Sequence, residues 1–443
     1  MIKNYKFYKN PFILFLPFLI LYIIIIIIFS YDANFGDEIR YITYAKNLAH
    51  GFYSPPFPHI DLGNGPGYPL IITPLVAFNA PLILIKLMNA FFLYFSIIFL
   101  FKALQQILPY KFSLVFSIIW ALYPNNFELI MYTLPEVFTP SLIAILIFAI
   151  MKAFNSAETK NTRKYLFLAG FTFGYIILTK PVFGYVMIVF LLSMLILWIF
   201  NTKSLNYKKT IAVILIAFIV NIPYLAYTYH LTGKLFYWSS FGGNNLYWMS
   251  TPYPEEYGSY YVFPFKDSPE RIPDSKKQIQ LNHQKDFEKL LENPKVREAN
   301  VIDGQLQEGL TYGITQDELL KKMAIQNIKS YPLKFIQNCI SNAGRMIFNY
   351  PASYVLQKPS TLKRLPINGT LVVLVLFCLI PTLINWKELF FPVRFLLFLS
   401  VIYFGGSLLG TAEPRMFTVI VPILLLWIAL ILSKTVKVKL RFK

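Results

Sequence analysis

Charged side chains stand beside apolar runs at several points of this 443-residue chain. They are Asp37 and Glu38 in "DEIRY", Glu136 in "YTLPEVFTP", Lys180 in "LTKPVFGY", and Glu413 with Arg415 in "GTAEPRMF". A carboxylate near an apolar surface is suited to act as a general base, and basic side chains bind phosphate oxygens. The pattern suggests acid–base chemistry on a substrate that carries phosphate, if the fold brings these residues to one place.

The elements that must position these residues are membrane helices. Hydrophobic residues make up 56% of the chain and charged residues 14%, with a mean hydropathy of +0.52, whereas soluble proteins carry about 25% charged residues. Runs of about 17 to 25 apolar residues are long enough to cross a bilayer. Ten such segments are predicted, at 12–30, 81–101, 112–130, 134–153, 165–180, 182–200, 210–230, 367–385, 389–409 and 414–433. We interpret the first, which contains six consecutive isoleucines, as a signal anchor.

The distribution of charge predicts the orientation of these spans. With both termini in the cytoplasm, the inner loops and tails hold 19 of the 41 basic residues and only two of the 22 acidic ones. This asymmetry follows the positive-inside rule. It accounts for nearly all of the net charge of +19, so the charge does not indicate a nucleic-acid partner. The expected location is the cell inner (plasma) membrane, with multiple passes and with the active site on the extracytoplasmic face.

The twenty remaining acidic residues fall on the outer side, which is where we expect any chemistry. Thirteen of them lie in one long loop. The fold class expected is therefore an all-α polytopic membrane protein with about ten transmembrane helices in three modules. Residues 1–230 form an N-terminal membrane module whose first outer loop, 31–80, carries the acidic pair. Residues 231–366 form an outer α-rich subdomain with amphipathic interfacial helices, and 367–443 form a C-terminal membrane module with a basic tail.

Simpler interpretations of the same residues stay open at this point. Asp37 and Glu38 could merely cap a helix that begins in "EIRY", since acidic residues favour the first turn. The turn "GNGPGYPLIITP" around Tyr68 could be a plain re-entrant turn. Lys180 could extend its amine to the interface, and Glu413 with Arg415 could form a local ion pair. In the long outer loop, Thr315 and Glu318 have the spacing of a capping box that starts a helix.

Several function classes lack their signature in this sequence. There is no phosphate-binding loop, dinucleotide fingerprint, nucleophile elbow or zinc-protease motif. The four histidines have no metal-ligand spacing, and the two cysteines do not suggest a disulfide. The sequence therefore gives no indication of ATP or NAD as a cofactor.

The order and sidedness of these motifs resemble the GT-C superfamily of membrane glycosyltransferases. Within it the resemblance is to the branch of protein O-mannosyltransferases and lipid A aminoarabinose transferases. The segments that carry it are "DEIRYITYAKNLAHGFY", "GPGYP", "TKP", "EPRMFTVIVPILLLW" and the soluble helix "DELLKKMA…IKSYPLKF". One departure is that aminoarabinose transferases carry a Lys where this chain has "GNGPGYP". This departure counts against a role on lipid A.

The resemblance implies transfer of a sugar from a polyprenyl-phosphate donor to a lipid, glycan or protein acceptor at the outer surface, with inversion. It implies Asp37 as the general base, with Glu38 supporting it or orienting the acceptor. The candidates for the donor phosphate are Arg40, Lys180 and Arg415. The candidates for substrate binding are Tyr41, Tyr68, Glu136 and Glu413, of which Glu136 matches a second acidic position of the family. Some members use a divalent metal, and Asp37, Glu38 and Glu136 could hold Mg or Mn.

Three other functions remain as alternatives. A lipid-linked glycan flippase or transporter would use charges near the middle of the membrane and inverted repeats, and few such charges occur in these spans. A polysaccharide polymerase or ligase would centre on basic residues and His in the large outer loop. A non-enzymatic scaffold is the third alternative.

Overall fold

The computed structural model describes residues 10–34, 36–155, 159–200, 205–261, 274–302, 305–306, 313–355 and 359–435. The chain is helical almost throughout, which confirms the expected fold class. The N-terminal helices are α1 (Pro11–Leu14), α2 (Leu16–Phe29), α3 (Asp37–Ala49), α4 (Gly67–Ala77), α5 (Leu82–Leu104), α6 (Tyr110–Ala121), α7 (Pro124–Leu129), α8 (Pro135–Asn155), α9 (Thr159–Thr179), α10 (Val182–Phe200) and α11 (Leu205–Thr232).

The remaining elements follow in chain order. They are α12 (Gly242–Met249), α13 (Asp274–Leu291), α14 (Pro294–Ala299), the two-residue strands β1 (Val301–Ile302) and β2 (Gln305–Leu306), α15 (Ile314–Ser330), α16 (Pro332–Phe348), α17 (Pro359–Ile384), α18 (Phe391–Leu408), α19 (Pro414–Thr418) and α20 (Val421–Thr435). β1 and β2 pair as a small antiparallel hairpin.

All ten predicted apolar segments contain helix. Among the described residues, six helices are long and apolar enough to cross a membrane: α5, α8, α10, α11, α17 and α18. This establishes a multi-pass membrane protein, while the number of spans remains a prediction. Two predicted spans are interrupted, because Pro124 begins a new helix within 112–130 and the helix that begins at Pro414 ends at Thr418 before α20 starts.

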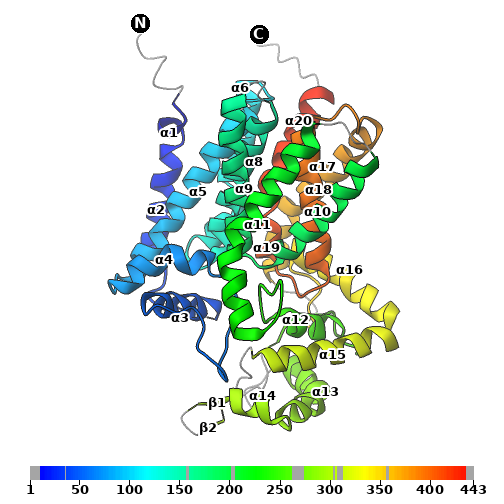
Figure 1. The fold of residues 1–443 in the computed structure, drawn as a ribbon. Coiled ribbons are helices and arrows are strands. Elements are labelled where there is room, and N and C mark those ends of the chain that lie inside the picture. Colours follow the sequence, from blue (N-terminus) through cyan, green and yellow to red (C-terminus); the bar gives the residue numbers. More distant parts are fainter. Residues whose placement is uncertain are drawn as a thin grey trace, which may run out of the picture.

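The helices form one upright bundle with a layer of shorter helices at one end (Figure 1). α1 and the last turn of α20 lie at the opposite end from α3 and α12–α16. We call the end with α3 and α12–α16 the loop end. The acidic pair and the long outer loop therefore share one side, as the distribution of charge predicts. The last eight residues of the basic tail, 436–443, lie outside the described residues.

Burial separates central helices from peripheral ones. In α20 every residue from Val421 to Ile431 is buried, and a helix that is apolar all round belongs in the core. In the most apolar 18-residue stretch of α8, 78% of the stretch is buried inside the protein, whereas the corresponding share in α17 is only 22%. The exposed apolar faces of peripheral helices such as α17 are suited to lipid.

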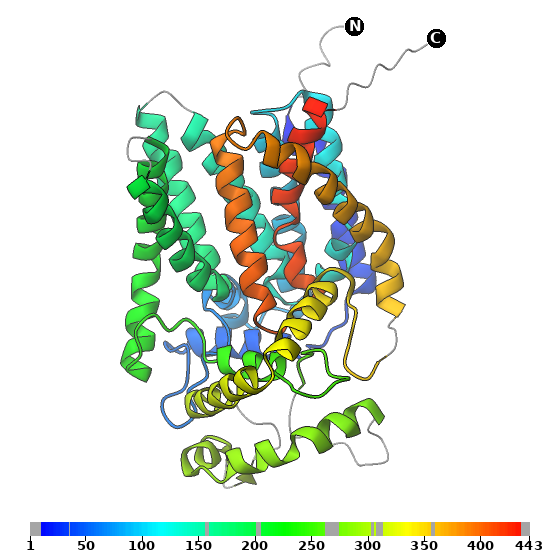
Figure 2. The ribbon, with the colours of Figure 1, turned by 90° about the vertical axis from the view of Figure 1, so that its right-hand side faces the viewer.

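The layer at the loop end has an apolar cluster of its own, formed by Tyr247, Trp248, Ile279, Phe287, Leu290, Val296, Leu320 and Ala324. α15 and α16 run beneath the bundle, and α13 lies farther out (Figure 2). Pro332 begins α16 directly after α15, and α16 is amphipathic, as expected for helices of this subdomain. The division of the chain into three modules remains our proposal.

The predicted capping box at Thr315 is wrong. α15 begins at Ile314 with Gly313 as its N-cap, and no side chain caps it. The acidic residues that follow bond elsewhere. Asp317 accepts hydrogen bonds from the backbone of Gly243 and Asn244 at 2.7 and 3.0 Å and thereby caps α12, while Glu318 forms an ion pair with Lys234.

Candidate active site

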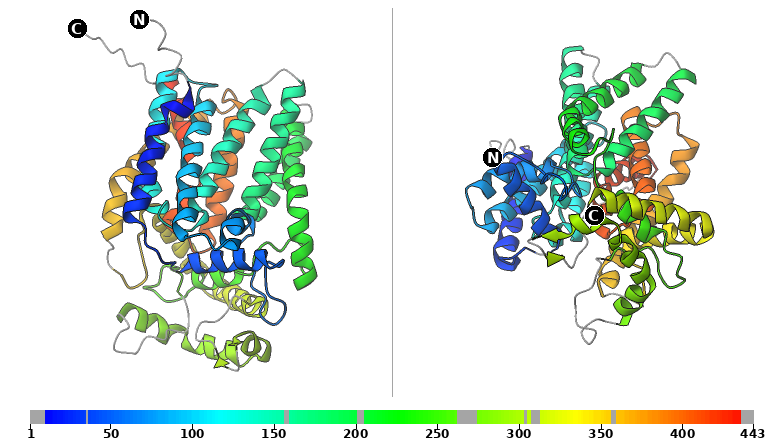
Figure 3. Two further views of the ribbon diagram at one scale, coloured as in Figure 1. Left: turned by 90° about the vertical axis from the view of Figure 1, so that its left-hand side faces the viewer. Right: turned by 60° about the horizontal axis from the view of Figure 1, so that its bottom comes forward.

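α3 lies at the loop end of the bundle, as a view from another side also shows (Figure 3), and the acidic pair lies in its first turn. The helix begins at Asp37 with Gly36 as N-cap, at a φ of 55°, so Asp37 is the first helical residue and not the cap that we considered. Both carboxylates favour this position because the first turn of a helix carries exposed N–H groups. Adjacent helix residues point in different directions, and Asp37 and Glu38 accordingly have different partners.

Asp37 belongs to an ion network that joins four segments distant in sequence. Nη2 of Arg415 lies 2.6 Å from Oδ2 of Asp37, and Nη1 lies 3.7 Å from Oε1 of Glu136. Nζ of Lys180 lies 2.9 Å from the same Glu136 oxygen, and Nε of Arg415 lies 2.7 Å from Oε2 of Glu413. Five predicted site residues are thus in contact. The local Glu413–Arg415 pair exists as well, within this larger network.

The pKa of Asp37 is lowered from its usual value. Burial alone raises the pKa, but the charge and hydrogen bond of Arg415, together with the charges of Arg40 and Lys180, outweigh it. The carboxyl is therefore ionised at neutral pH but is held by a guanidinium. A bound carboxylate of this kind is a poor base until the cation finds another anion.

Glu38 is buried on the other side of α3. Its Oε1 accepts a hydrogen bond from the backbone nitrogen of Thr133 at 2.6 Å. Thr133 precedes α8, whose first turn carries Glu136. Glu38 thus links the helix of Asp37 to the segment that places Glu136, which is a supporting position.

Arg40 points to the first outer loop. Its Nη1 donates to Oδ1 of Asn64 at 2.9 Å, and the amide of Asn64 donates to the hydroxyl of Tyr41 at 2.5 Å. Asp61 of the same loop accepts from Tyr44 at 2.6 Å. The structure therefore places Arg40 beside the network through its charge on Asp37, but among polar residues of its own.

Asn64 and Asp61 were not among the site residues predicted. Asn64 stands inside the quoted motif "GNGPGYP", and Asp61 is one of the outer acidic residues near span ends. Their positions in the loop before the turn "GPGYP" were the signal in the sequence that could have identified them. The fold shows why it matters, because α3 packs against α4 and brings the loop between them onto Arg40.

The turn before α4 is locked to the end of α9, next to Lys180. A Cβ on Gly65 would lie 2.1 Å from the carbonyl oxygen of Leu178, and one on Gly67 would lie 2.5 Å from Oγ1 of Thr179. Only glycine permits this approach. The two motifs "GPGYP" and "TKP" are therefore parts of one contact, which fixes the backbone that carries Lys180.

Two buried oxygens beside the network make no hydrogen bond within the described part of the chain. They are the hydroxyl of Tyr68 and Oε2 of Glu136. Tyr68 is fully buried and packs edge-on against Tyr41, with ring centroids 5.5 Å apart. Buried polar atoms in proteins are nearly always paired, so these oxygens mark a place that lacks a polar partner.

The described residues do not form a donor set for a divalent metal. No group of three His, Cys, Asp or Glu side chains gathers at any point of the described ranges. The carboxylates of Asp37 and Glu136 face Arg415, and Glu38 faces a backbone amide. The expected ligand trio of Asp37, Glu38 and Glu136 is thus divided, and we derive no step through a metal.

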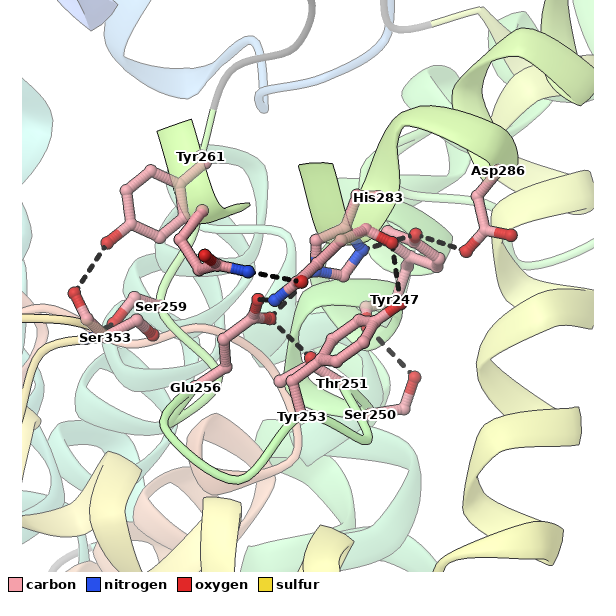
Figure 4. Close-up of polar contacts among 12 residues, drawn as sticks. Tyr247, Ser250, Thr251, Tyr253, Glu256, Ser259, Tyr261, His283, Asp286 and Ser353 are labelled. Atoms are coloured by element: carbon pink, nitrogen blue, oxygen red, sulfur yellow. Dashed lines mark hydrogen bonds and ion pairs between the residues drawn. The ribbon is translucent and has the colours of Figure 1, made fainter. Parts of the chain in front are cut away.

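A second polar cluster lies inside the layer at the loop end (Figure 4). Oε2 of Glu256 lies 2.8 Å from Nε2 of His283, and the Tyr247 hydroxyl lies 2.7 Å from Nδ1 of His283 and 2.6 Å from Oδ2 of Asp286. Glu256, His283 and Tyr247 are each buried. Because these side chains satisfy one another away from solvent, we interpret the cluster as the polar core of this layer and not as a substrate site.

Comparison with known proteins rests on structure alone. No protein-family model matches the chain, and no curated protein does. The oligosaccharyltransferase of Archaeoglobus fulgidus, tethered to an acceptor peptide with an NVT sequon, matches with a TM-score of 0.52 at 11% identity over 97% of this chain and 50% of its own. The chain thus spans about half the length of that enzyme.

Two further solved structures are similar at lower scores. The same oligosaccharyltransferase, AglB, in complex with an inhibitory peptide and a dolichol-phosphate, gives a TM-score of 0.48 at 12% identity, over 95% of this chain and 50% of its own. ArnT from Cupriavidus metallidurans in the apo state gives 0.42 at 10% identity, over 94% and 77%. The likeness extends over nearly the whole chain. The protein therefore shares the fold of the Archaeoglobus fulgidus oligosaccharyltransferase over 97% of this chain.

Proposed function

We propose that this protein is a membrane glycosyltransferase that moves a sugar from a polyprenyl-phosphate donor to an acceptor hydroxyl or phosphate. The observation that carries the proposal is the network in which Arg415 and Lys180 meet Asp37 and Glu136 at the loop end of the bundle. It combines a carboxylate that can accept a proton with two cations that can hold a phosphate. The GT-C fold supports the same class of reaction.

In the proposed reaction the donor phosphate binds Arg415 and Lys180, with Arg40 nearby. The acceptor oxygen attacks C1 of the sugar as the bond from C1 to the phosphate oxygen breaks. The electron pair of that bond stays on the polyprenyl phosphate, whose charge the two cations stabilise. The acceptor proton passes to Asp37. A single displacement inverts the anomeric carbon.

Binding of the donor would also increase the basicity of Asp37, which Arg415 keeps low in the free protein. A phosphate competes with Asp37 for the guanidinium of Arg415, because both are anions that accept the same N–H donors. When Arg415 turns to the phosphate, the pKa of Asp37 rises and the carboxylate becomes available as a base. The donor would therefore prepare the base that activates the acceptor.

The other predicted residues receive supporting roles in this proposal. Glu38 holds α3 against the start of α8. Tyr41 keeps Asn64, and through it Arg40, in place. The unpaired oxygens of Glu136 and Tyr68 are suited to hydroxyl groups of the sugar. Glu413 helps to orient Arg415.

We further propose that the loop end faces the extracytoplasmic side of the plasma membrane, since the basic loops lie at the other end. The experiment compares lipid extracts and surface glycans of the host with and without the gene by mass spectrometry. Deletion should cause a polyprenyl-phosphate sugar to accumulate and one glycan modification to disappear. If the protein were a flippase, its deletion would leave the lipid-linked sugar on the inner face of the membrane. If it were a polymerase, its deletion would shorten a glycan without removing a substituent. Either result would contradict the proposal.

A further inference from the structure

The loop between α18 and α19 leads directly to Glu413 and Arg415, and α16 holds it through one side chain. The amide nitrogen of Asn342 donates to the carbonyls of Ser407, Leu408 and Gly410 at 3.2, 3.3 and 2.5 Å. Its Oδ1 accepts from the backbone nitrogen of Ala412 at 3.0 Å. One buried side chain thus contacts four residues of the segment 407–412.

Arg345, one turn along the same face, completes this attachment. Its Nη2 donates to Oδ1 of Asn342 at 2.5 Å, and its Nε donates to the carbonyl of Ala412 at 3.2 Å. Its remaining N–H groups bind the carbonyls of Tyr257 and Gly258, both at 2.8 Å. Arg345 as a whole is 5% exposed, and none of the described hydrogen-bond partners of its guanidinium is a carboxylate.

These contacts fix the loop more firmly than a salt bridge at the surface would. A buried guanidinium or amide that loses its partners is costly, so shifts of the loop that break these bonds are strongly disfavoured. The carbonyls of Tyr257 and Gly258 also tie Arg345 to the layer at the loop end. The loop is therefore held between the bundle and that layer.

We infer that Asn342 and Arg345 are positioning residues for Arg415. Ala412, which both side chains bind, is three residues before Arg415. Its placement sets the start of α19 and hence the 2.6 Å contact of Arg415 with Asp37. The role of Arg415 toward a donor phosphate rests on the proposed function. The positioning of Arg415 against Asp37 does not.

The test compares Asn342→Leu with Asn338→Leu, a matched control on the same helix. Asn338 is equally buried, and its hydrogen bonds within the described residues go to the carbonyls of Met249 and Thr251, at 3.0 and 3.1 Å, and not to the loop 407–412. Arg345→Lys keeps the positive charge while losing the forked geometry. It serves as the milder variant if Asn342→Leu does not fold.

The first readout is labelling of Asp37 by a water-soluble carbodiimide and an amine, followed by mass spectrometry across pH, with Asp37→Asn as background. The side chain is 35% exposed and so within reach of the reagent. Loosening Arg415 raises the pKa of Asp37, and carbodiimides react with the protonated acid. The labelling midpoint should therefore move to higher pH in Asn342→Leu and in Arg345→Lys, but stay at the wild-type value in Asn338→Leu.

The second readout is binding of undecaprenyl phosphate to the protein in nanodiscs. Asn342→Leu should weaken it about tenfold, the scale of one unsatisfied buried group, and Asn338→Leu should not. Equal labelling midpoints in all variants, or equal shifts in Asn342→Leu and Asn338→Leu, would overturn the inference. If wild-type protein does not bind undecaprenyl phosphate, the proposed function fails, while the labelling still decides the positioning role.

Discussion

The sharpest prediction concerns Asp37→Asn. Asparagine keeps the shape of the side chain but cannot take a proton. Loss of a general base typically costs about 10²- to 10⁴-fold in rate, or roughly 3 to 5 kcal/mol of transition-state stabilisation at about 1.36 kcal/mol per decade. The structure predicts a much smaller effect on folding. The Asp37 and Arg415 side chains are 35% and 22% exposed, and Arg415 keeps Glu136 and Glu413 as partners, so the loss should be about 1 kcal/mol or less.

The matched control is Asp32→Asn, the same chemical change at an exposed carboxylate of the same outer loop. Each variant is expressed in the deletion strain, and the polyprenyl-phosphate sugar that accumulates is quantified by mass spectrometry. Thermal unfolding of the purified protein reports the fold. Asp37→Asn should unfold like the wild type and accumulate the donor as the deletion does, whereas Asp32→Asn should behave as wild type. A folded Asp37→Asn variant with transfer within about tenfold of wild type would refute the assignment.

Further predictions test the electrostatics and the polar cores. Arg415 holds Asp37 in the free protein, and a bound donor draws Arg415 away. The acidic limb of the pH profile of kcat/KM should therefore lie at lower pH than that of kcat. Coincident acidic limbs would exclude the proposed move of Arg415 from Asp37 to the donor phosphate. Chelation with EDTA should leave transfer unchanged, since cationic side chains supply the positive charge; activity lost in EDTA and restored by Mg or Mn would contradict this. Tyr68→Phe removes an unpaired buried hydroxyl, so unfolding should be no easier, and reduced transfer would identify a substrate contact. Glu256→Gln breaks a buried pair with His283 and should cost about 3 kcal/mol, measured by thermal unfolding, and an unchanged unfolding midpoint would count against it.

The same Glu256 pair predicts a pH dependence of stability. Burial raises the pKa of Glu256, but the hydrogen bond and charge of His283, with Thr251 and Asn282, bring it below the usual value. A carboxyl with a depressed pKa in the folded state stabilises the protein above its ordinary pKa of about 4.3 and loses this contribution as the pH falls further. Unfolding midpoints recorded from neutral to acidic pH should therefore decline in wild type more steeply than in Glu256→Gln.

Much of the architecture was accessible from the sequence because apolar runs in a membrane protein leave the backbone few choices. Where water is absent, helices satisfy every backbone hydrogen bond locally, so ten apolar segments predict ten helical regions. Pro181 separates α9 from α10, at the boundary between the predicted spans 165–180 and 182–200. The charge asymmetry placed the acidic pair and the long loop at one end, and the fold agrees. The capping box at Thr315 failed because α15 already begins at Ile314, which places Thr315 inside the helix, and because Glu318 pairs with Lys234 instead.

The sequence by itself determined the membrane class, the end of the bundle at which the charged residues lie, and most members of the candidate site. These depend on hydropathy and charge, which each segment carries alone. Only the tertiary structure decided which partner each of these residues contacts. Adjacent residues Asp37 and Glu38 face different partners, Arg415 reaches across 378 positions to lower the pKa of Asp37, and Asn342 fixes the loop before Arg415. Such contacts join segments far apart in the chain, and their geometry arises only when the helices pack.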